Sequence, residues 1–221
     1  MFYIRRATLT DLPKILKVEE SWPQDSRAGE DKFLARLERF GEGFFIACVK
    51  NENHEDVIAT LTAMPLNYKP EQISEMHTWD QVTNRGYLHP SKPISFNALY
   101  IVSGVVDRKH RGAYANLFQA GILSEVELAH TLKLKYVVAG AVLPGYKKYC
   151  ESHSEIPIAE YCHLRKGQHL IDPLLAMYES IHFHLPDDRH IISEYYPDDA
   201  SKNYAAILVR DVEKYPLSTS N

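Results

Sequence analysis

The chain has 221 residues, of which 45% are hydrophobic and 24% charged, so it can bury a sizeable core as an ordinary globular protein. A formal net charge of −4 argues against general affinity for nucleic acid or for an anionic membrane, and it confines any basic patch to a local site. No apolar run approaches the roughly 20 residues of a membrane span. The N-terminus lacks a signal-peptide core, and three widely spaced cysteines give no disulfide framework. We therefore expect a cytoplasmic protein that binds neither nucleic acid nor membrane.

The first half of the chain predicts the element order β-α-α-β-β. The first helix has Thr10 as its expected cap and Pro13 in its first turn. The second helix carries four apolar residues on one expected face, and these are Phe33, Leu34, Leu37 and Phe40. Two apolar segments on either side of a polar NENHE predict a β-hairpin. The five elements are expected, in order, over 2–8, 8–22, 29–40, 43–50 and 56–66.

The second half alternates strands with helices, which is typical of a parallel strand pair joined by a helical crossover. A polar insertion over 67–93 precedes it, and a second long segment over 143–170 precedes the last helix. We find no internal repeat and no linker, so we expect a single domain over 1–221 in the α/β (α+β) class. The expected elements are a strand over 95–106, a helix after Gly112, a strand over 135–142, a helix over 172–183, and strands over 189–196 and 203–211.

The stretch GVVDRKHRGAYANLFQAG, Gly104 to Gly121, joins a strand end, a cationic turn with one glycine and a helix start. A helix N-terminus presents unpaired N–H groups and the positive end of the helix dipole, which together favour phosphate groups. A plain basic turn is the alternative. Helical spacing also puts Glu125 within the apolar arc of this helix. The residues expected to face the sheet are Ala113, Leu117, Phe118, Gly121 and Ile122.

The late helix DPLLAMYESIHF carries Tyr178, followed by His182 and Phe183. A tyrosine hydroxyl stays protonated at neutral pH and can donate its proton to a thiolate leaving group. A buried core tyrosine is the alternative.

The element order and these two motifs together resemble the GCN5-related N-acetyltransferase (GNAT) family, whose members transfer an acyl group from acyl-CoA to an amine. The resemblance covers the whole chain. It implies a mixed, mostly antiparallel sheet flanked by helices, in the order β-α-α-β-β-β-α-β-α-β-β with insertions at about 67–93 and 143–170. The family's Q/R-x-x-G-x-G/A loop fits in two registers, because either Arg111 and Gly112 form its Arg-Gly pair or Lys109 opens it and Tyr114 closes it. The family's proline and second glycine are absent.

For the site, the resemblance implies acetyl-CoA or another acyl-CoA as co-substrate, with no metal. Tyr178 would be the general acid that protonates the CoA thiolate, and backbone N–H groups at a strand bulge would polarise the thioester carbonyl. Val105 and Val106 would receive the pantetheine chain. The pyrophosphate would lie on the backbone amides of the loop, which contains Lys109, Arg111, Gly112, Ala113 and Tyr114.

We therefore expect an acyl-CoA-dependent N-acyltransferase, with N-acetyl transfer as the first choice, acting by direct transfer on an amine of a small molecule. A homodimer is left open. The strand over 95–106 contains no Glu to act as base, and its polar candidates are Asn97, Tyr100 and Ser103. The alternatives are an inactive GNAT-like CoA-binding module and an acyltransferase that uses acyl carrier protein as donor. The C-x2-H-x8-C-H spacing from Cys150 matches no structural zinc site, so we expect no metal.

Overall fold

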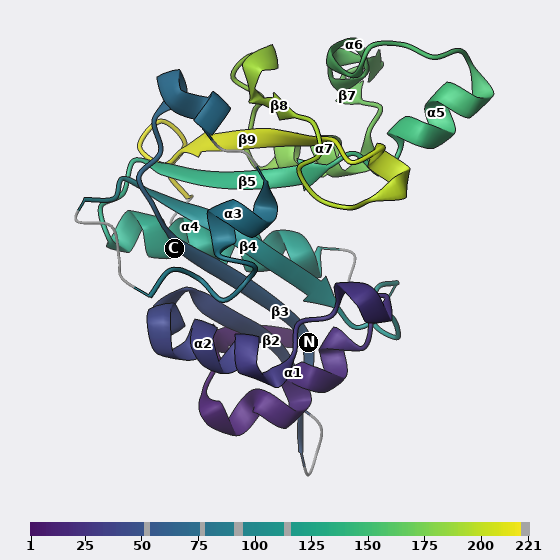
Figure 1. Cartoon of the computed structure of the whole chain (residues 1–221). Coiled ribbons are helices and arrows are strands. Elements are labelled where there is room, and N and C mark those ends of the chain that lie inside the picture. Colours follow the sequence, from purple (N-terminus) through teal and green to yellow (C-terminus); the bar gives the residue numbers. More distant parts are fainter. Residues whose placement is uncertain (51–53, 76–77, 91–94, 113–115, 218–221) are drawn as a thin grey trace.

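A seven-stranded sheet runs through the computed structural model, which describes residues 1–50, 54–75, 78–90, 95–112 and 116–217. The strand order is β1-β2-β3-β4-β5-β9-β8, and within these residues β4 and β5 form the one parallel pair (Figure 1). Two short strands, β6 and β7, pair separately. The strands are β1 (Phe2–Arg6), β2 (Phe44–Lys50), β3 (Glu55–Leu66), β4 (Ala98–Val106), β5 (Tyr136–Val142), β6 (Arg165–Lys166), β7 (His169–Leu170), β8 (Ile191–Ile192) and β9 (Ala205–Asp211).

Helices cover both faces of this sheet. Helices α1 and α2 bury their apolar sides against one face of β2, while the start of α4 packs against the opposite face. The α-helices are α1 (Leu12–Glu19), α2 (Glu30–Phe40), α3 (Trp79–Thr83), α4 (Leu117–Thr131), α5 (Tyr146–Ser152), α6 (Ile158–His163) and α7 (Pro173–Ser180). Short 3-10 helices span Leu9–Asp11, Gln24–Ser26, Gly41–Gly43, Pro70–Glu75, Asp188–His190 and Asp199–Ser201.

The element order predicted from the sequence is confirmed, and the two insertions contain short elements of their own. The first holds a 3-10 helix and α3, and the second holds α5, α6, β6 and β7. Two predicted boundaries were wrong. Helix α4 begins at Leu117, later than predicted, and the strand predicted over 189–196 shrinks to the two residues of β8. Glu194 has a φ of 50°, a left-handed conformation that turns the chain out of the strand.

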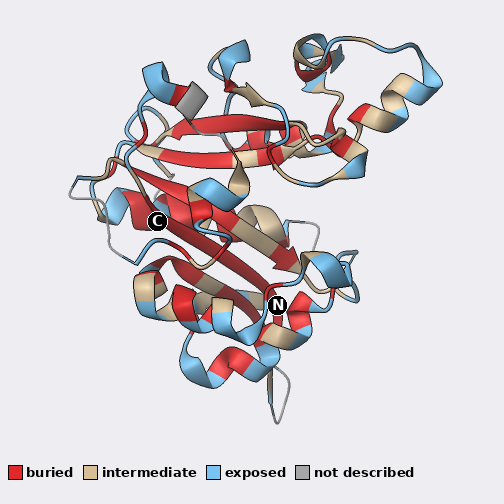
Figure 2. Ribbon diagram, in the orientation of Figure 1, coloured by how far each residue is buried: buried red, intermediate tan, exposed pale blue. Residues whose placement is uncertain are grey.

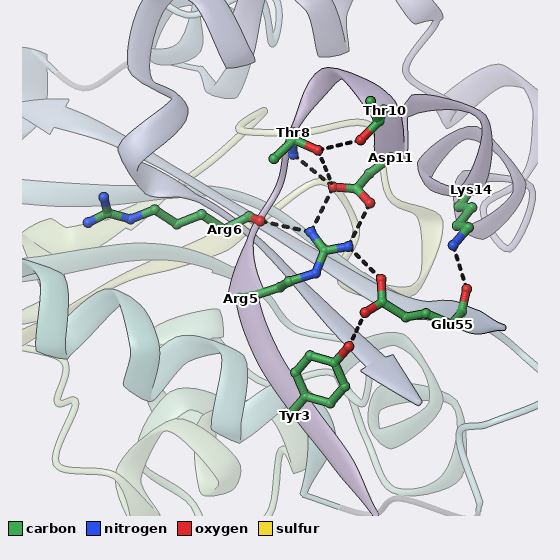
Figure 3. A network of polar contacts seen from close by, with 8 residues as sticks. All are labelled: Tyr3, Arg5, Arg6, Thr8, Thr10, Asp11, Lys14 and Glu55. Carbon is green, nitrogen blue, oxygen red and sulfur yellow. Dashed lines mark hydrogen bonds and ion pairs between the residues drawn. The ribbon is translucent and has the colours of Figure 1, made fainter. Parts of the chain in front are cut away.

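The junction between β1 and α1 is held by a buried carboxylate, which corrects the predicted cap. Asp11 accepts a hydrogen bond from the Thr8 backbone N–H at 2.8 Å and pairs with the Arg5 guanidinium at 2.7 and 2.8 Å (Figure 3). The Arg5 hydrogen bond lowers the pKa of Asp11 to about 2. Thr8 and Asp11 thus form the capping box, whereas Thr10 only shares a hydroxyl contact with Thr8. Pro13 lies in the first turn as predicted.

The core follows the central strands, where both faces of the sheet are buried (Figure 2). On α2 the predicted apolar face is partly wrong. Phe33 and Phe40 are buried, but Leu34 is 40% exposed and the charged Arg36 is only 2% exposed. This arginine lies three residues after Phe33 and four before Phe40, so the helical period places it on the buried side.

Candidate functional site

Strands β4 and β5 diverge along their length. They pair from Ala98 and Tyr136 to Ile101 and Ala139, and the pairing ends there. Because β4 continues to Val106 and β5 to Val142, their C-terminal halves separate without pairing, and we call this unpaired stretch between the two strands the opening (Figure 1). A separation of parallel strands of this kind gives a ligand access to backbone N–H and C=O groups that are otherwise paired.

A β-bulge marks the start of the divergent half of β4. Thr62 of β3 faces Ser103, and the next residue, Ala63, faces Ile101, so Val102 is the additional residue. The indole Nε1 of Trp79 donates a hydrogen bond to the Val102 carbonyl oxygen at 2.8 Å. The first insertion is therefore attached to the irregular point of β4 through α3.

Tyr178 lies on the side of the opening that α4 covers. The Phe118 ring meets the Tyr178 ring edge-on at 6.5 Å between centroids, and Phe118 also packs on Gly104 in the divergent half of β4. Tyr178 is only 4% exposed, and burial raises the pKa of its hydroxyl. No hydrogen bond within the described residues involves this hydroxyl, which suits a group that awaits a partner from a ligand.

The predicted pantetheine residues occupy the divergent half of β4 but face opposite ways. Val105 is buried in the core under α1 and α2, and the partly exposed Val106 packs in the cluster that contains Leu117 of α4. Backbone groups between them are the parts of this strand that a ligand in the opening can reach.

The basic turn follows directly after β4 and is partly closed by Asp107. The Asp107 carboxylate accepts a hydrogen bond from the Lys109 backbone N–H at 2.9 Å, and its carbonyl accepts one from His110, also at 2.9 Å. Of the predicted phosphate ligands, Lys109, Arg111 and Gly112 are exposed at this turn. The other two, Ala113 and Tyr114, lie outside the described residues. The amides from Arg111 onward are thus the ones to test for phosphate contact.

Alanine substitutions at Gly112 and Gly104 should differ in their effect on stability. A Cβ on Gly112 meets no atom of the described residues within 4 Å, so Gly112→Ala should change the free energy of unfolding by less than about 0.5 kcal/mol. A Cβ on Gly104 comes within 2.3 Å of the Phe118 ring and 2.6 Å of Leu61, so Gly104→Ala should cost about 1–3 kcal/mol. Urea denaturation of both variants checks this, and equal losses would contradict it.

The three polar residues considered on β4 and just before it are each engaged elsewhere. The Asn97 side chain bonds the backbone of Tyr68 through both its oxygen and its nitrogen. The hydroxyl of Tyr100 bonds that of Tyr195, and Ser103 accepts a hydrogen bond from Arg36 at 3.0 Å. None of the three is therefore free as a base in this arrangement.

Three residues near the opening were missed by sequence reasoning: Arg36, Thr62 and Trp79. The signal that could have indicated burial of Arg36 was its position between Phe33 and Phe40 at helical spacing. A tryptophan inside an otherwise polar insertion was the signal for Trp79. Nothing in the sequence singles out Thr62 from the other threonine of its strand, Thr60.

Among the described residues, no helix combines the length and apolar character that a bilayer crossing needs. No cluster of three or more His, Cys, Asp or Glu side chains is placed there to hold a metal ion.

Known proteins match this chain in two ways, by sequence and by structure. No protein-family model matches the chain. Among curated proteins, the chain is similar to the Bacillus subtilis (strain 168) protein named "Probable hydrolase YhcX", with 28% identity over 221 residues that cover 98% of this chain and 40% of the relative. The chain thus spans about two fifths of the length of the curated relative it matches.

Solved structures match over nearly the whole chain. The loading GNATL domain of CurA from Lyngbya majuscula superposes with a TM-score of 0.77 at 17% identity, covering 97% of this chain and 99% of that one. The GphF GNAT-like decarboxylase in complex with isobutyryl-CoA gives 0.74 at 19%, covering 95% and 99%. The ribosomal-protein-S18-alanine N-acetyltransferase from Escherichia coli gives 0.55 at 14%, covering 96% and 94%. The chain therefore has the GNAT fold that its element order and motifs predicted.

Proposed function

We propose that this protein binds an acyl-CoA in the opening between β4 and β5 and transfers the acyl group to an amine of a small molecule. The observation that carries the proposal is the position of the Tyr178 ring, which meets Phe118 where Phe118 packs on the divergent half of β4, with the basic turn directly after that strand. A relative of known structure, the GphF GNAT-like decarboxylase, holds isobutyryl-CoA on the same fold. N-acetyl transfer is the first activity to test, because the fold is shared with an N-acetyltransferase.

In the proposed reaction, a neutral amine nitrogen attacks the thioester carbon. The C–N bond forms, and the carbonyl electrons move onto oxygen, where backbone N–H groups near the Val102 bulge would stabilise them. Collapse of this intermediate breaks the C–S bond, and the thiolate takes the Tyr178 proton. The nitrogen, which carries an extra proton after the attack, passes that proton through water to the tyrosinate. A hydroxyl with a raised pKa holds its proton at neutral pH, so Tyr178 is in the protonated form that a general acid needs.

The Tyr178→Phe variant tests the proposed general acid. We expect kcat to fall by about 100-fold or more, because the thiolate leaves without a proton donor. The free energy of unfolding should stay unchanged, since the hydroxyl has no hydrogen-bond partner among the described residues. Tyr161→Phe is the matched control, because Tyr161 is also buried but its hydroxyl bonds Asp172 at 3.0 Å, away from the Tyr178–Phe118 contact. That variant should lose stability and keep turnover per folded molecule.

CoA binding is tested separately by thermal shift with CoA, acetyl-CoA and buffer alone. Stabilisation by CoA, followed by CoA release over a panel of amines, supports the proposal. Absence of any shift with either ligand would overturn it. Turnover by Tyr178→Phe at the wild-type rate would remove that residue from its role while leaving CoA binding intact.

A second candidate is decarboxylation of a carboxyacyl-CoA. It is favoured by the better superposition on the CurA loading GNATL domain and the GphF decarboxylase than on the N-acetyltransferase, and by the lack of a carboxylate base on β4. In that reaction the C–C bond to the carboxylate breaks, the electron pair enters the thioester enolate, and a proton adds to carbon. Release of CO2 from malonyl-CoA without any amine distinguishes it from amine acylation.

A further inference from the structure

The Arg36 guanidinium is buried with most of its hydrogen-bonding capacity unused. Its Nε donates to the Gly86 carbonyl oxygen at 2.8 Å, and one Nη1–H donates to Ser103 Oγ at 3.0 Å. The other three N–H groups have no acceptor within the described part of the chain, and no carboxylate there lies within ion-pair distance. The side chain is only 2% exposed. Burial lowers the pKa of Arg36 to about 10, and the charge of Glu19 opposes this from beyond ion-pair distance, so a closer anion would stabilise the buried cation.

A second unpaired group faces the same place. Thr62 is 1% exposed, and its Oγ1 is buried with no hydrogen-bond partner among the described residues. Thr62 lies directly opposite Ser103 in the pairing of β3 with β4, so both side chains project from the same face of the sheet. Since Ser103 accepts from Arg36, its own hydroxyl hydrogen stays free to donate. Three donors from α2, β3 and β4 therefore converge on this face.

These donors lie next to the irregular point of β4. Ser103 directly follows Val102, the bulged residue whose carbonyl oxygen Trp79 holds. The Trp79 ring and the Arg36 guanidinium pack closely around Gly86, because a Cβ there would come within 2.8 Å of the ring and 3.0 Å of Arg36 Nη2. A carboxylate is a small planar group that accepts hydrogen bonds along one edge, and it matches the donor edge of a guanidinium.

We infer that Arg36, Ser103 and Thr62 form a carboxylate subsite, and that one substrate of this protein carries a carboxylate that binds there. The inference rests on the proposed function for the location of the reacting group, and it adds the substrate class. The carboxylate could belong to an amino-acid acceptor or to a carboxyacyl group on CoA, and the same donors would recognise either.

The test follows the Arg36 Nε–H signal by NMR of the full chain labelled with 15N-arginine, assigned by its loss in Arg36→Lys. Glycine and malonyl-CoA are titrated, with glycinamide and acetyl-CoA as matched probes that lack the carboxylate. We expect the signal to move with at least one carboxylate and with neither matched probe. Thr62→Val, which keeps the shape and removes the hydroxyl, should weaken that affinity about fivefold.

The probe that moves the Arg36 signal identifies the source of the carboxylate. A response to glycine assigns the carboxylate to the acceptor, and a response to malonyl-CoA assigns it to the acyl group. The inference is overturned if the signal moves with neither, or if Thr62→Val binds the carboxylate as well as wild type. Thermal shift with CoA distinguishes failure of the carboxylate subsite from failure of the proposed function. CoA stabilisation without an Arg36 response would refute the subsite and leave the proposed function standing, whereas an Arg36 response without CoA stabilisation would do the reverse.

Discussion

Replacing Asp172 by alanine is expected to lower the free energy of unfolding by about 2–4 kcal/mol, the loss of a helix cap together with two orphaned buried donors. Asp172 is 1% exposed and caps α7, because its Oδ1 accepts from the backbone N–H groups of Leu174 and Leu175 at 3.0 and 3.2 Å. Its Oδ2 accepts from the Gly145 backbone N–H at 3.1 Å and the Tyr161 hydroxyl at 3.0 Å. One carboxylate thus joins α7 to the start of the second insertion, at Gly145, and to α6 within it, at Tyr161.

The control is Asp172→Asn, because asparagine caps a helix as well as aspartate but turns the second oxygen into an N–H donor. The stability lost by this variant should come from the contacts with Gly145 and Tyr161 alone, and it should be smaller than the stability lost by the alanine variant. Adding Tyr161→Phe to this variant should recover part of the loss, since one of the two clashing donors is gone. Denaturant unfolding of the set measures these differences. An alanine variant as stable as wild type would show that the network contributes nothing.

Glu125 should make the protein less stable as the pH rises. This residue of α4 is fully buried, and neither of its carboxylate oxygens has a hydrogen-bond partner among the described residues. Burial raises the pKa of Glu125 well above the ordinary value of 4.5, against a smaller opposing effect of Arg6. Between the two pKa values the folded chain holds a proton that the unfolded chain releases. The contribution of Glu125 is therefore most favourable below the unfolded pKa and falls by up to about 1.4 kcal/mol per pH unit above it.

Comparison with Glu125→Gln isolates this effect, because glutamine keeps the shape and cannot ionise. The variant should gain on wild type as the pH rises above the unfolded pKa of about 4.5, which denaturant unfolding at a series of pH values measures. Glu127→Gln is the matched control on the same helix, since Glu127 is exposed. Its difference from wild type should stay small and flat. Stability curves of wild type and Glu125→Gln that run parallel over this pH range would contradict the assignment.

The sequence identified the elements whose patterns are local. Tyr178 could be found because it lies on a helix that begins with Asp172 and Pro173, a strong start signal. The element order followed from alternating apolar segments. Glu125 was located within the apolar arc of α4, and the structure places it at full burial.

Arg36 shows why the rest could not be predicted. An amphipathic helix is predicted by assigning apolar residues to its buried face. A charged residue on that face is tolerated only when groups far away in the sequence accept its hydrogen bonds. The partners of Arg36 are Gly86 and Ser103, which lie 50 and 67 residues further along the chain. No local pattern contains such contacts. The same holds for β8, where a left-handed Glu194 ended a strand that its composition favoured.

The bond between Trp79 and the Val102 carbonyl gives the protein an intrinsic optical reporter. The chain has two tryptophans, and the other, Trp22, is 38% exposed on the α1–α2 connection. Indole emission depends on whether its N–H is bonded and on the polarity around the ring. With Trp22 replaced by phenylalanine, the remaining fluorescence comes from the one ring attached to the bulge of β4. Rearrangement of that strand by an incoming molecule can then be followed in real time without a label.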